Sequence, residues 1–248
     1  MATRLARPSR QSPRNGAHPC ATCEARSVSV CNAIHDTDLA SLATIAIVTE
    51  AGPGQCFIDE GEPADAFFNI TAGSAKLFKL LPDGRRQIIG FVGPGHFLGI
   101  AVSDTYAFSA EAIEPVRYCR FRRGKLRALL DDFPLMEKRL LEVAANELVA
   151  AQEQMLLLGR KTARERLASF LLSQSRQGLT CGHARRRFTL PMTRNDIADY
   201  LGLTIETISR TLTRLRNEGL IEIAVQSDVL VENPRGLEEL AGGLPARI

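Results

Sequence analysis

Three cysteines lie close together near the start of the chain, in the stretch HPCATCEARSVSVC. Cys20, Cys23 and Cys31 follow the pattern C-x2-C-x7-C, and a short loop with this spacing can bring three thiolates to one point. Thiolates are ligands for soft metals and for iron–sulfur clusters, so the pattern favours a metal centre or a cluster. Two alternatives stay open at this point, a regulatory disulfide and thiols that share no role.

A second set of hydrogen-bonding side chains lies near the other end of the chain. On a helix predicted after Thr204, the residues Glu206, Ser209, Arg210 and Thr213 share one face because they are three or four positions apart. A carboxylate can accept from cytosine N4, and a guanidinium can fork onto guanine O6 and N7. The alternative for Glu206 and Arg210 is a surface ion pair on an ordinary helix, worth about 0.3–0.5 kcal/mol.

The surrounding segment, Thr193–Gly219, favours the DNA interpretation. Ala198, Gly202 and Ile208 have the spacing that lets two helices cross closely around a tight turn, as in a helix-turn-helix. Thr204 is a good N-cap for the second helix. The side chains expected to be buried are Ile197, Tyr200 and Leu201 in the first helix and Ile208, Leu212 and Leu215 in the second. We therefore predict base reading by Glu206, Ser209 and Arg210, and phosphate contacts by Thr193, Arg194, Thr207 and Arg214.

Length and composition are compatible with two domains in a chain of 248 residues. The net charge of +3 does not by itself indicate nucleic-acid binding, but many of the arginines fall in the last third of the chain. No apolar run is long enough to cross a membrane, and no apolar signal core follows the N-terminal arginines, so we expect a cytoplasmic protein without a membrane partner. There, the six cysteines suit ligands or buried thiols better than a disulfide framework.

The first half of the chain reads as a tail, a short helix and a succession of strands. Residues 1–17 are rich in Arg, Ser, Pro and Gly, and we expect them to be disordered. A short helix is predicted for residues 36–47. Turn signals then alternate with the segments FFNI, AKLFKLL, RQIIGFV and SAEAIEPVRYCRF, which predicts antiparallel strands in a small barrel or roll. Residues 18–130 are thus expected to form a cysteine loop and a β-roll.

A long helix follows the predicted roll. The helical pattern returns at Lys125, and Pro134 begins a stretch whose apolar residues alternate by three and four through three heptads. Further apolar residues flank this stripe, so the helix has more apolar surface than one neighbour would cover. We predict a dimerisation helix over residues 131–159 with its wide side on the roll; the alternative is a core stripe. The predicted dimer seam is Leu141, Ala144, Leu148, Ala151, Met155 and Leu158.

Residues 160–248 are predicted to form the second domain. TARERLASFLLSQSRQ is an amphipathic helix, RRFTLPM is a strand that leads into the helix-turn-helix, and LIEIA with VLVEN reads as a hairpin, or wing. The predicted fold class is α+β, with an N-terminal antiparallel β-roll, a long dimerisation helix and a C-terminal winged helix-turn-helix.

This order of elements resembles the CRP/FNR superfamily of bacterial transcription regulators, and within it the FNR branch of oxygen-responsive iron–sulfur regulators. The resemblance runs from about Cys20 to Ala241 and is most specific in MLLLGRKTARERLASFL and MTRNDIADYLGLTIETISR, which contains the pattern E-x2-S-R. It implies a cyclic-nucleotide-binding-like roll and a [4Fe–4S] cluster held by Cys20, Cys23, Cys31 and Cys119. The DNA-reading Glu, Ser and Arg of the family fall on Glu206, Ser209 and Arg210.

The resemblance also implies a working cycle and partners. Such a protein is a homodimer rather than an enzyme, and its intact cluster favours DNA binding at low oxygen, where it controls genes for low-oxygen metabolism together with RNA polymerase. It implies TTGAT-type half-sites in a pseudo-palindrome, about 34 Å apart. Two positions depart from the best-known members: seven residues rather than five separate Cys23 from Cys31, and Gln152 stands where they have an Asp.

Relatives that bind cyclic AMP carry G-E-L and then an R-S pair in the roll. Here the corresponding stretches are Gly99-Ile100-Ala101 and Phe108-Ser109-Ala110, so we expect no cyclic nucleotide, whose phosphate would meet apolar side chains. Two other functions remain as alternatives. One is a regulator of the same family that senses haem or nitric oxide through the roll, and the other is an iron–sulfur electron carrier. The carrier lacks support, because the sequence has no G-x-G-x-x-G, P-loop or second cysteine quartet.

Overall fold

The structure is a computed structural model that describes residues 19–100, 104–176, 186–224 and 228–242. The predicted N-terminal tail, 1–17, lies outside the described residues. By its internal contacts the chain divides into two units. The first comprises Met1–Lys79 and Gly90–Glu147, and the second comprises Leu80–Ile89 and Leu148–Ile248.

The cysteine loop folds into short helical turns. Three 3-10 turns, η1 (Glu24–Val28), η2 (Val30–Ala33) and η3 (Asp36–Asp38), precede the helix α1 (Leu39–Ile45). The helix predicted for residues 36–47 is therefore shorter than expected. Its last two residues belong instead to strand β1 (Ala46–Ala51), because each of these residues pairs with a residue of β8.

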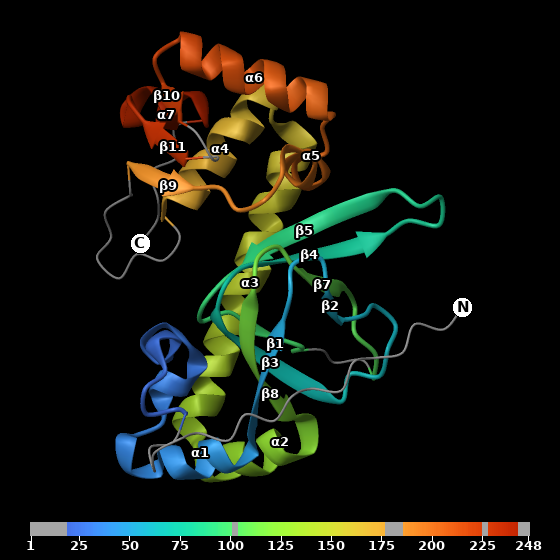
Figure 1. Ribbon diagram of the computed structural model, residues 1–248, viewed down its shortest axis with the longest axis vertical. Coiled ribbons are helices and arrows are strands. Elements are labelled where there is room, and N and C mark those ends of the chain that lie inside the picture. The colour runs from blue at the N-terminus through green and yellow to red at the C-terminus, as the bar shows by residue number, and fades with distance from the viewer. Residues whose placement is uncertain (1–18, 101–103, 177–185, 225–227, 243–248) are drawn as a thin grey trace. The chain divides into compact units, whose positions relative to one another are not determined.

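Two four-stranded antiparallel sheets make up the roll, which confirms the predicted architecture. The first sheet has the order β1-β8-β3-β6, where β8 is Val116–Arg122, β3 is Ala66–Ala72 and β6 is Phe97–Leu98. The second has the order β2-β7-β4-β5, formed by β2 (Cys56–Ile58), β7 (Ser109–Ala112), β4 (Ala75–Leu80) and β5 (Arg86–Val92). Figure 1 shows β1, β8 and β3 running side by side.

The turn between β3 and β4 depends on a glycine. Gly73 has φ +77°, a left-handed conformation that glycine adopts without steric cost. A Cβ atom at this position would lie 2.1 Å from the backbone oxygen of Pro115. Any side chain there would push the strand connection away from its neighbour.

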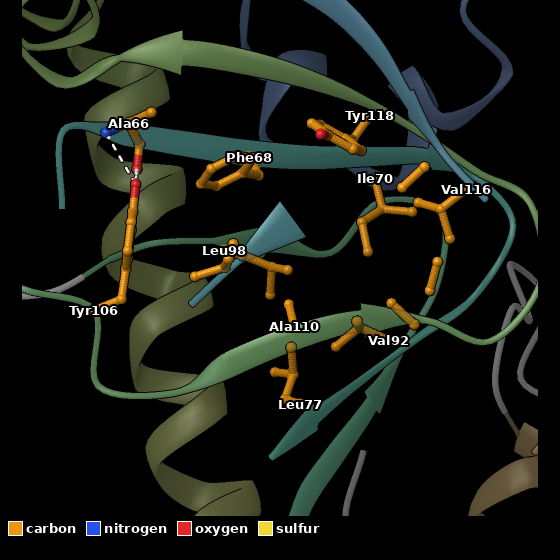
Figure 2. Packing of buried hydrophobic residues seen from close by; sticks show 14 of the residues in the cluster. Ala66, Phe68, Ile70, Leu77, Val92, Leu98, Tyr106, Ala110, Val116 and Tyr118 are labelled. Atoms are coloured by element: carbon orange, nitrogen blue, oxygen red, sulfur yellow. Dashed lines mark hydrogen bonds between the residues drawn. The ribbon is translucent and has the colours of Figure 1, made fainter. Parts of the chain in front are cut away.

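The interior of the roll is packed with aromatic and aliphatic side chains, which point toward one another in Figure 2. Phe68 and Tyr118 lie edge to face with ring centroids 5.6 Å apart, a favourable aromatic geometry. The hydroxyl of Tyr106 donates to the carbonyl of Ala66 at 2.9 Å and accepts from its amide at 3.1 Å. The one polar atom of this buried tyrosine is therefore satisfied, and it fixes the start of β3.

Helices α2 (Arg123–Asp132) and α3 (Pro134–Arg160) follow the roll, and α3 confirms the prediction of a long helix in this part of the chain. On one side of α3, Met136 is buried, and Leu140 and Val143 pack against the apolar cluster that contains the cysteine loop. On another side, large apolar residues are exposed: Leu141 (68%), Leu148 (61%) and Met155 (66%). Of the other predicted seam residues, Ala151 is exposed, and Ala144 and Leu158 are half-buried. No described helix is both long and apolar enough to cross a membrane.

The second unit contains the predicted winged helix-turn-helix. Helix α4 (Ala163–Arg176) buries the predicted Leu167, Phe170 and Leu171. Strands β9 (Arg187–Thr189), β10 (Ile221–Ile223) and β11 (Asp228–Val231) form a small antiparallel sheet in the order β10-β11-β9. Helices α5 (Arg194–Leu201) and α6 (Ile205–Asn217) lie between β9 and β10 in the chain, and α7 (Pro234–Leu240), which was not predicted, follows the wing (Figure 1).

Candidate DNA interface and cysteine group

Helix α5 begins with a reciprocal hydrogen-bonded cap. Thr193 is the N-cap: its hydroxyl accepts from the amide of Asp196 at 3.1 Å, and the Asp196 carboxylate accepts from the amide of Thr193 at 3.1 Å. The helix ends at Gly202, whose φ of +61° lets the chain turn sharply. Ala198, expected at the helix crossing, is buried. The local sequence thus fixes both ends of the first helix of the motif.

The next helix, α6, is capped as predicted. The Thr204 hydroxyl accepts from the amide of Thr207 at 3.2 Å. Ile208, Leu212 and Leu215 are all buried, which fixes the rotation of the helix about its axis. As a result, the opposite side of α6 is turned outward.

The outward side of α6 carries the predicted base-reading residues. Glu206 and Arg210 are exposed, and Ser209 is half-buried between them. The Ser209 hydroxyl accepts a hydrogen bond from Arg194 Nη1 at 3.4 Å, which links this face to the first helix. Thr213 is exposed one turn further on. A carboxylate and a guanidinium on one outward face, in the first two turns of the second helix, can reach base edges in a major groove.

The residues predicted to contact phosphates are engaged in different ways. The hydroxyls of Thr193 and Thr207 already take part in the two helix caps, with Asp196 and Thr204. Arg214 is exposed but pairs with Glu218, the C-cap of α6, with 2.9 Å between Nε and Oε1. A charge that is shared with a carboxylate attracts phosphate less than a free one.

Arg194, the fourth predicted phosphate contact, lines a hollow at the surface of the second unit. The other residues that line it are Arg216, Thr213, Leu212, Ile223 and Ala224. Strand β10 of the wing therefore contributes to the hollow together with α5 and α6. Two guanidiniums around one hollow suit an anionic oxygen of the DNA backbone.

We define the cysteine group as Cys20, Cys23, Cys31 and Cys119. It comprises three residues of the N-terminal loop and one residue of strand β8 of the roll. Cys20 and Cys31 are buried in one apolar cluster, and Cys119 of β8 packs against the same cluster. The amide of Cys31 donates to the Ser29 hydroxyl at 3.2 Å, which caps η2. Cys119, far along the chain, thus lies with the loop cysteines, as the resemblance implied.

The thiols of this group are close enough to influence one another. The pKa of Cys119 is raised to about 12, mainly by burial and additionally by the neighbouring Cys31, Cys20 and Cys23. The pKa of Cys31 is raised to about 11, mainly by burial; Cys20 and Cys23 contribute to this shift, while the hydrogen bond with Ser29 and the charge of Arg26 oppose it. The buried thiols are therefore neutral at physiological pH when nothing is bound to them.

The donor chemistry of the cysteine group fits an iron–sulfur cluster. A [4Fe–4S] cluster requires four thiolate ligands. The cysteine group supplies four thiols that lie close enough to shift one another's pKa, partly in apolar surroundings. Within the part of the chain that the structure describes, no three His, Cys, Asp or Glu side chains are already arranged to hold a single metal ion. Binding would therefore require the thiols to lose protons and turn toward a common centre.

The comparisons with known proteins match both units. Residues 48–133 match the cyclic nucleotide-binding domain, and residues 165–240 match the Crp-like helix-turn-helix domain. The chain is 42% identical over 234 residues to the transcriptional activatory protein AadR of Rhodopseudomonas palustris, which covers 91% of this chain and 98% of that protein. The chain belongs to the CRP/FNR superfamily.

Other members of the CRP/FNR superfamily give the same result. The transcriptional activator protein FnrL of Cereibacter sphaeroides is 38% identical over 237 residues, covering 92% of this chain and 96% of that protein. The solved structure of FixK2 from Bradyrhizobium japonicum has a TM-score of 0.74 and 34% identity, covering 81% of this chain and all of that one. This CRP/FNR protein is thus a DNA-binding transcription regulator and not an enzyme.

One residue beside the cysteine group was not predicted from the sequence to be functional. Asn69 of β3 is 1% exposed, and its Nδ2 donates to the sulfur of Cys31 at 3.8 Å. The available signal was a single amide in the otherwise apolar run AFFNI. Cys56 is not part of the cysteine group: it lies on β2, which pairs with β7 in the second sheet, whereas Cys119 lies on β8 in the first sheet. Cys181 and His183, for which the sequence offers no second pair of zinc ligands, lie outside the described residues.

Proposed function

We propose that this protein is a homodimeric transcription activator whose DNA binding is controlled by an oxygen-labile [4Fe–4S] cluster. The observation that carries the proposal is the meeting of Cys119 with the three loop cysteines, since four mutually influencing thiols have no evident use in a nucleotide-binding roll. The names of AadR and FnrL, both called activators, support the sign of regulation. Its place of action would be the cytoplasm, where the DNA is.

Cys20, Cys23, Cys31 and Cys119 would hold the cluster. When bound, the cluster supplies a group that reacts with oxygen and so reports its presence. The chain's own contribution is to exclude water from one side of the site, through the apolar side chains around Cys20 and Cys31, and to connect the site to α3. That connection is direct, because Met136 of α3 belongs to the same apolar cluster as these two cysteines.

Dimerisation would use the exposed stripe of α3. Leu141, Leu148 and Met155 are each more than half exposed and lie seven residues apart. Exposed leucines at a heptad repeat are typical of a two-helix seam. A dimer built on this stripe would present two α6 helices to DNA, so its site would be a pseudo-palindrome with half-sites about 34 Å apart.

Glu206, Ser209 and Arg210 would read the bases of TTGAT-type half-sites. Arg210 would fork onto the guanine, and Glu206 would accept from the cytosine of that pair or one nearby. Arg194 and Arg216 would hold the backbone at the hollow beside the wing. RNA polymerase would be the partner at promoters of genes for low-oxygen metabolism.

The test of the sensor is iron and acid-labile sulfide content of protein purified without oxygen, with an absorption spectrum before and after air. We expect about four iron and four sulfide per chain and a spectrum that bleaches in air. Serine at Cys119 should abolish or strongly weaken binding, while the matched control Cys56→Ser should not. Haem, iron without sulfide, or wild-type iron content in Cys119→Ser would contradict the proposal.

A further inference from the structure

Asn69 lies where the roll meets the cysteine loop. In the register of the first sheet it is the partner of Cys119 on β8 and of Phe97 on β6. Its side chain is almost wholly buried, and its Nδ2 donates to Cys31 Sγ at 3.8 Å. One amide thus connects two members of the cysteine group, the first by strand pairing and the second by a hydrogen bond.

The surroundings of Asn69 make an amide costly. The apolar cluster on this side of the sheet includes Phe97, Phe121 and Cys31. Among the described residues, Asn69 Oδ1 has no hydrogen-bond partner, and a buried polar atom without a partner lowers stability. For packing alone, a leucine of similar size would serve better at this position. What an asparagine provides here and a leucine would not is the amide N–H that donates to the sulfur of Cys31.

We propose that Asn69 is a positioning residue for the sulfur of Cys31 when that sulfur is an iron ligand; the inference rests on the proposed function. An N–H donated to a ligand sulfur stabilises its negative charge, and the effect is greater in a water-poor site. Hydrogen bonds to the sulfurs are one of the determinants of the reduction potential of an iron–sulfur site. Asn69 therefore raises the reduction potential and slows the loss of iron.

Asn69 also couples the loop to the sheet. In turn η2, the backbone amide of Cys31 donates to the Ser29 hydroxyl, and the sulfur of Cys31 accepts from Asn69 of β3. A merely structural role would change the stability of the loop without changing the electronic properties of bound iron. The two roles are therefore separable by spectroscopy.

The experiment compares Asn69→Leu, which keeps the size and removes the donor, with Asn69→Gln, which keeps an amide donor. Asn32→Leu is the matched control, because Asn32 is exposed and is the chain neighbour of Cys31. Each full-length protein is loaded without oxygen. The readouts are iron and sulfide content, the iron–sulfur stretching bands in resonance Raman spectra, the reduction potential, and the rate of iron loss to a chelator.

In Asn69→Leu we expect a shifted stretching band, a lower reduction potential and a 10–100-fold faster loss of iron, with Asn32→Leu like the wild type. If Asn69→Leu fails to load at all, loading of Asn69→Gln supports the inference, and equal failure of both overturns it in favour of packing. Wild-type bands and potential in a loaded Asn69→Leu overturn it while the proposed function stands. A wild-type protein that binds no iron and sulfide overturns the proposed function and this inference together.

Discussion

Truncation of Leu148 should weaken the dimer, because this residue lies in the middle of the exposed stripe of α3. Its side chain is 61% exposed in the single chain, so most of its apolar surface is still available for a partner. Leu148→Ala removes three carbons, and each buried methylene is worth about 0.8 kcal/mol. The helix itself should persist, since alanine is the strongest helix former.

The magnitude follows from the exposed fraction. Three carbons would contribute about 2.4 kcal/mol if fully transferred from water, and the exposed three-fifths corresponds to roughly 1.5 kcal/mol. A symmetric dimer contains the change twice, which gives about 3 kcal/mol. Since about 1.4 kcal/mol corresponds to a factor of ten, the dissociation constant should rise roughly a hundredfold. Leu148→Glu should weaken the dimer further, because it would place two like charges in the seam.

Sedimentation equilibrium without oxygen, over a range of protein concentrations, would measure this change. Val149→Ala is the matched control, because Val149 is the next residue, is 53% exposed, and lies off the heptad stripe. We expect the control to dimerise like the wild type. An unchanged dissociation constant for Leu148→Ala, or an equal rise of the dissociation constant for Val149→Ala, would refute the assignment of this stripe to the dimer seam.

Arg210→Ala should lose binding to every duplex tested, whereas Glu206→Ala should relax discrimination at one base pair by roughly 1–3 kcal/mol and keep or raise non-specific affinity, because it removes a negative charge near phosphates. Titrations at fixed salt against duplexes changed one pair at a time would check this, and equal weakening for all duplexes in Glu206→Ala would make that residue structural. Thr204→Ala should remove the cap of α6, cost about 1 kcal/mol and lower the melting temperature by roughly 2–4 °C in a calorimeter. Folding raises the pKa of Cys31 to about 11 and that of Cys119 to about 12, so the folded protein holds these two thiol protons more tightly than the unfolded chain does. In iron-free protein, this contribution to stability should be fully present below the ordinary thiol pKa of 9.0 and should be lost as pH rises through the two raised values. Denaturant titrations at a series of pH values would measure the loss. Because these thiols are protonated near neutral pH and bind iron as thiolates, cluster assembly should release protons and become more favourable as pH rises. Calorimetry in buffers of different ionisation enthalpy would measure the proton release.

The local features of the DNA-binding unit could be predicted from sequence. Thr204, Gly202 and the apolar spacing of α6 act within a few residues of the chain, so the cap, the turn and the buried side are encoded where they occur. The same holds for the heptads of α3, since a helix repeats its faces regardless of the rest of the protein. The outward side of α6, where base reading was predicted, is the side opposite its buried residues.

The tertiary structure alone decided how distant residues meet. The residues 46 and 47 could extend α1 by pattern, but pairing with β8 makes them strand, and no local signal announces that pairing. Cys119 was assigned to the cysteine group by resemblance, not by any spacing, because its neighbours come from another part of the chain. The surroundings of Asn69 were decided in the same way, by a register that pairs it with Cys119 and by a loop that brings Cys31 within hydrogen-bond distance of its side chain. Sequence specifies the side chains and the local backbone, whereas contacts between strands and loops far apart in the chain exist only once the sheet has formed.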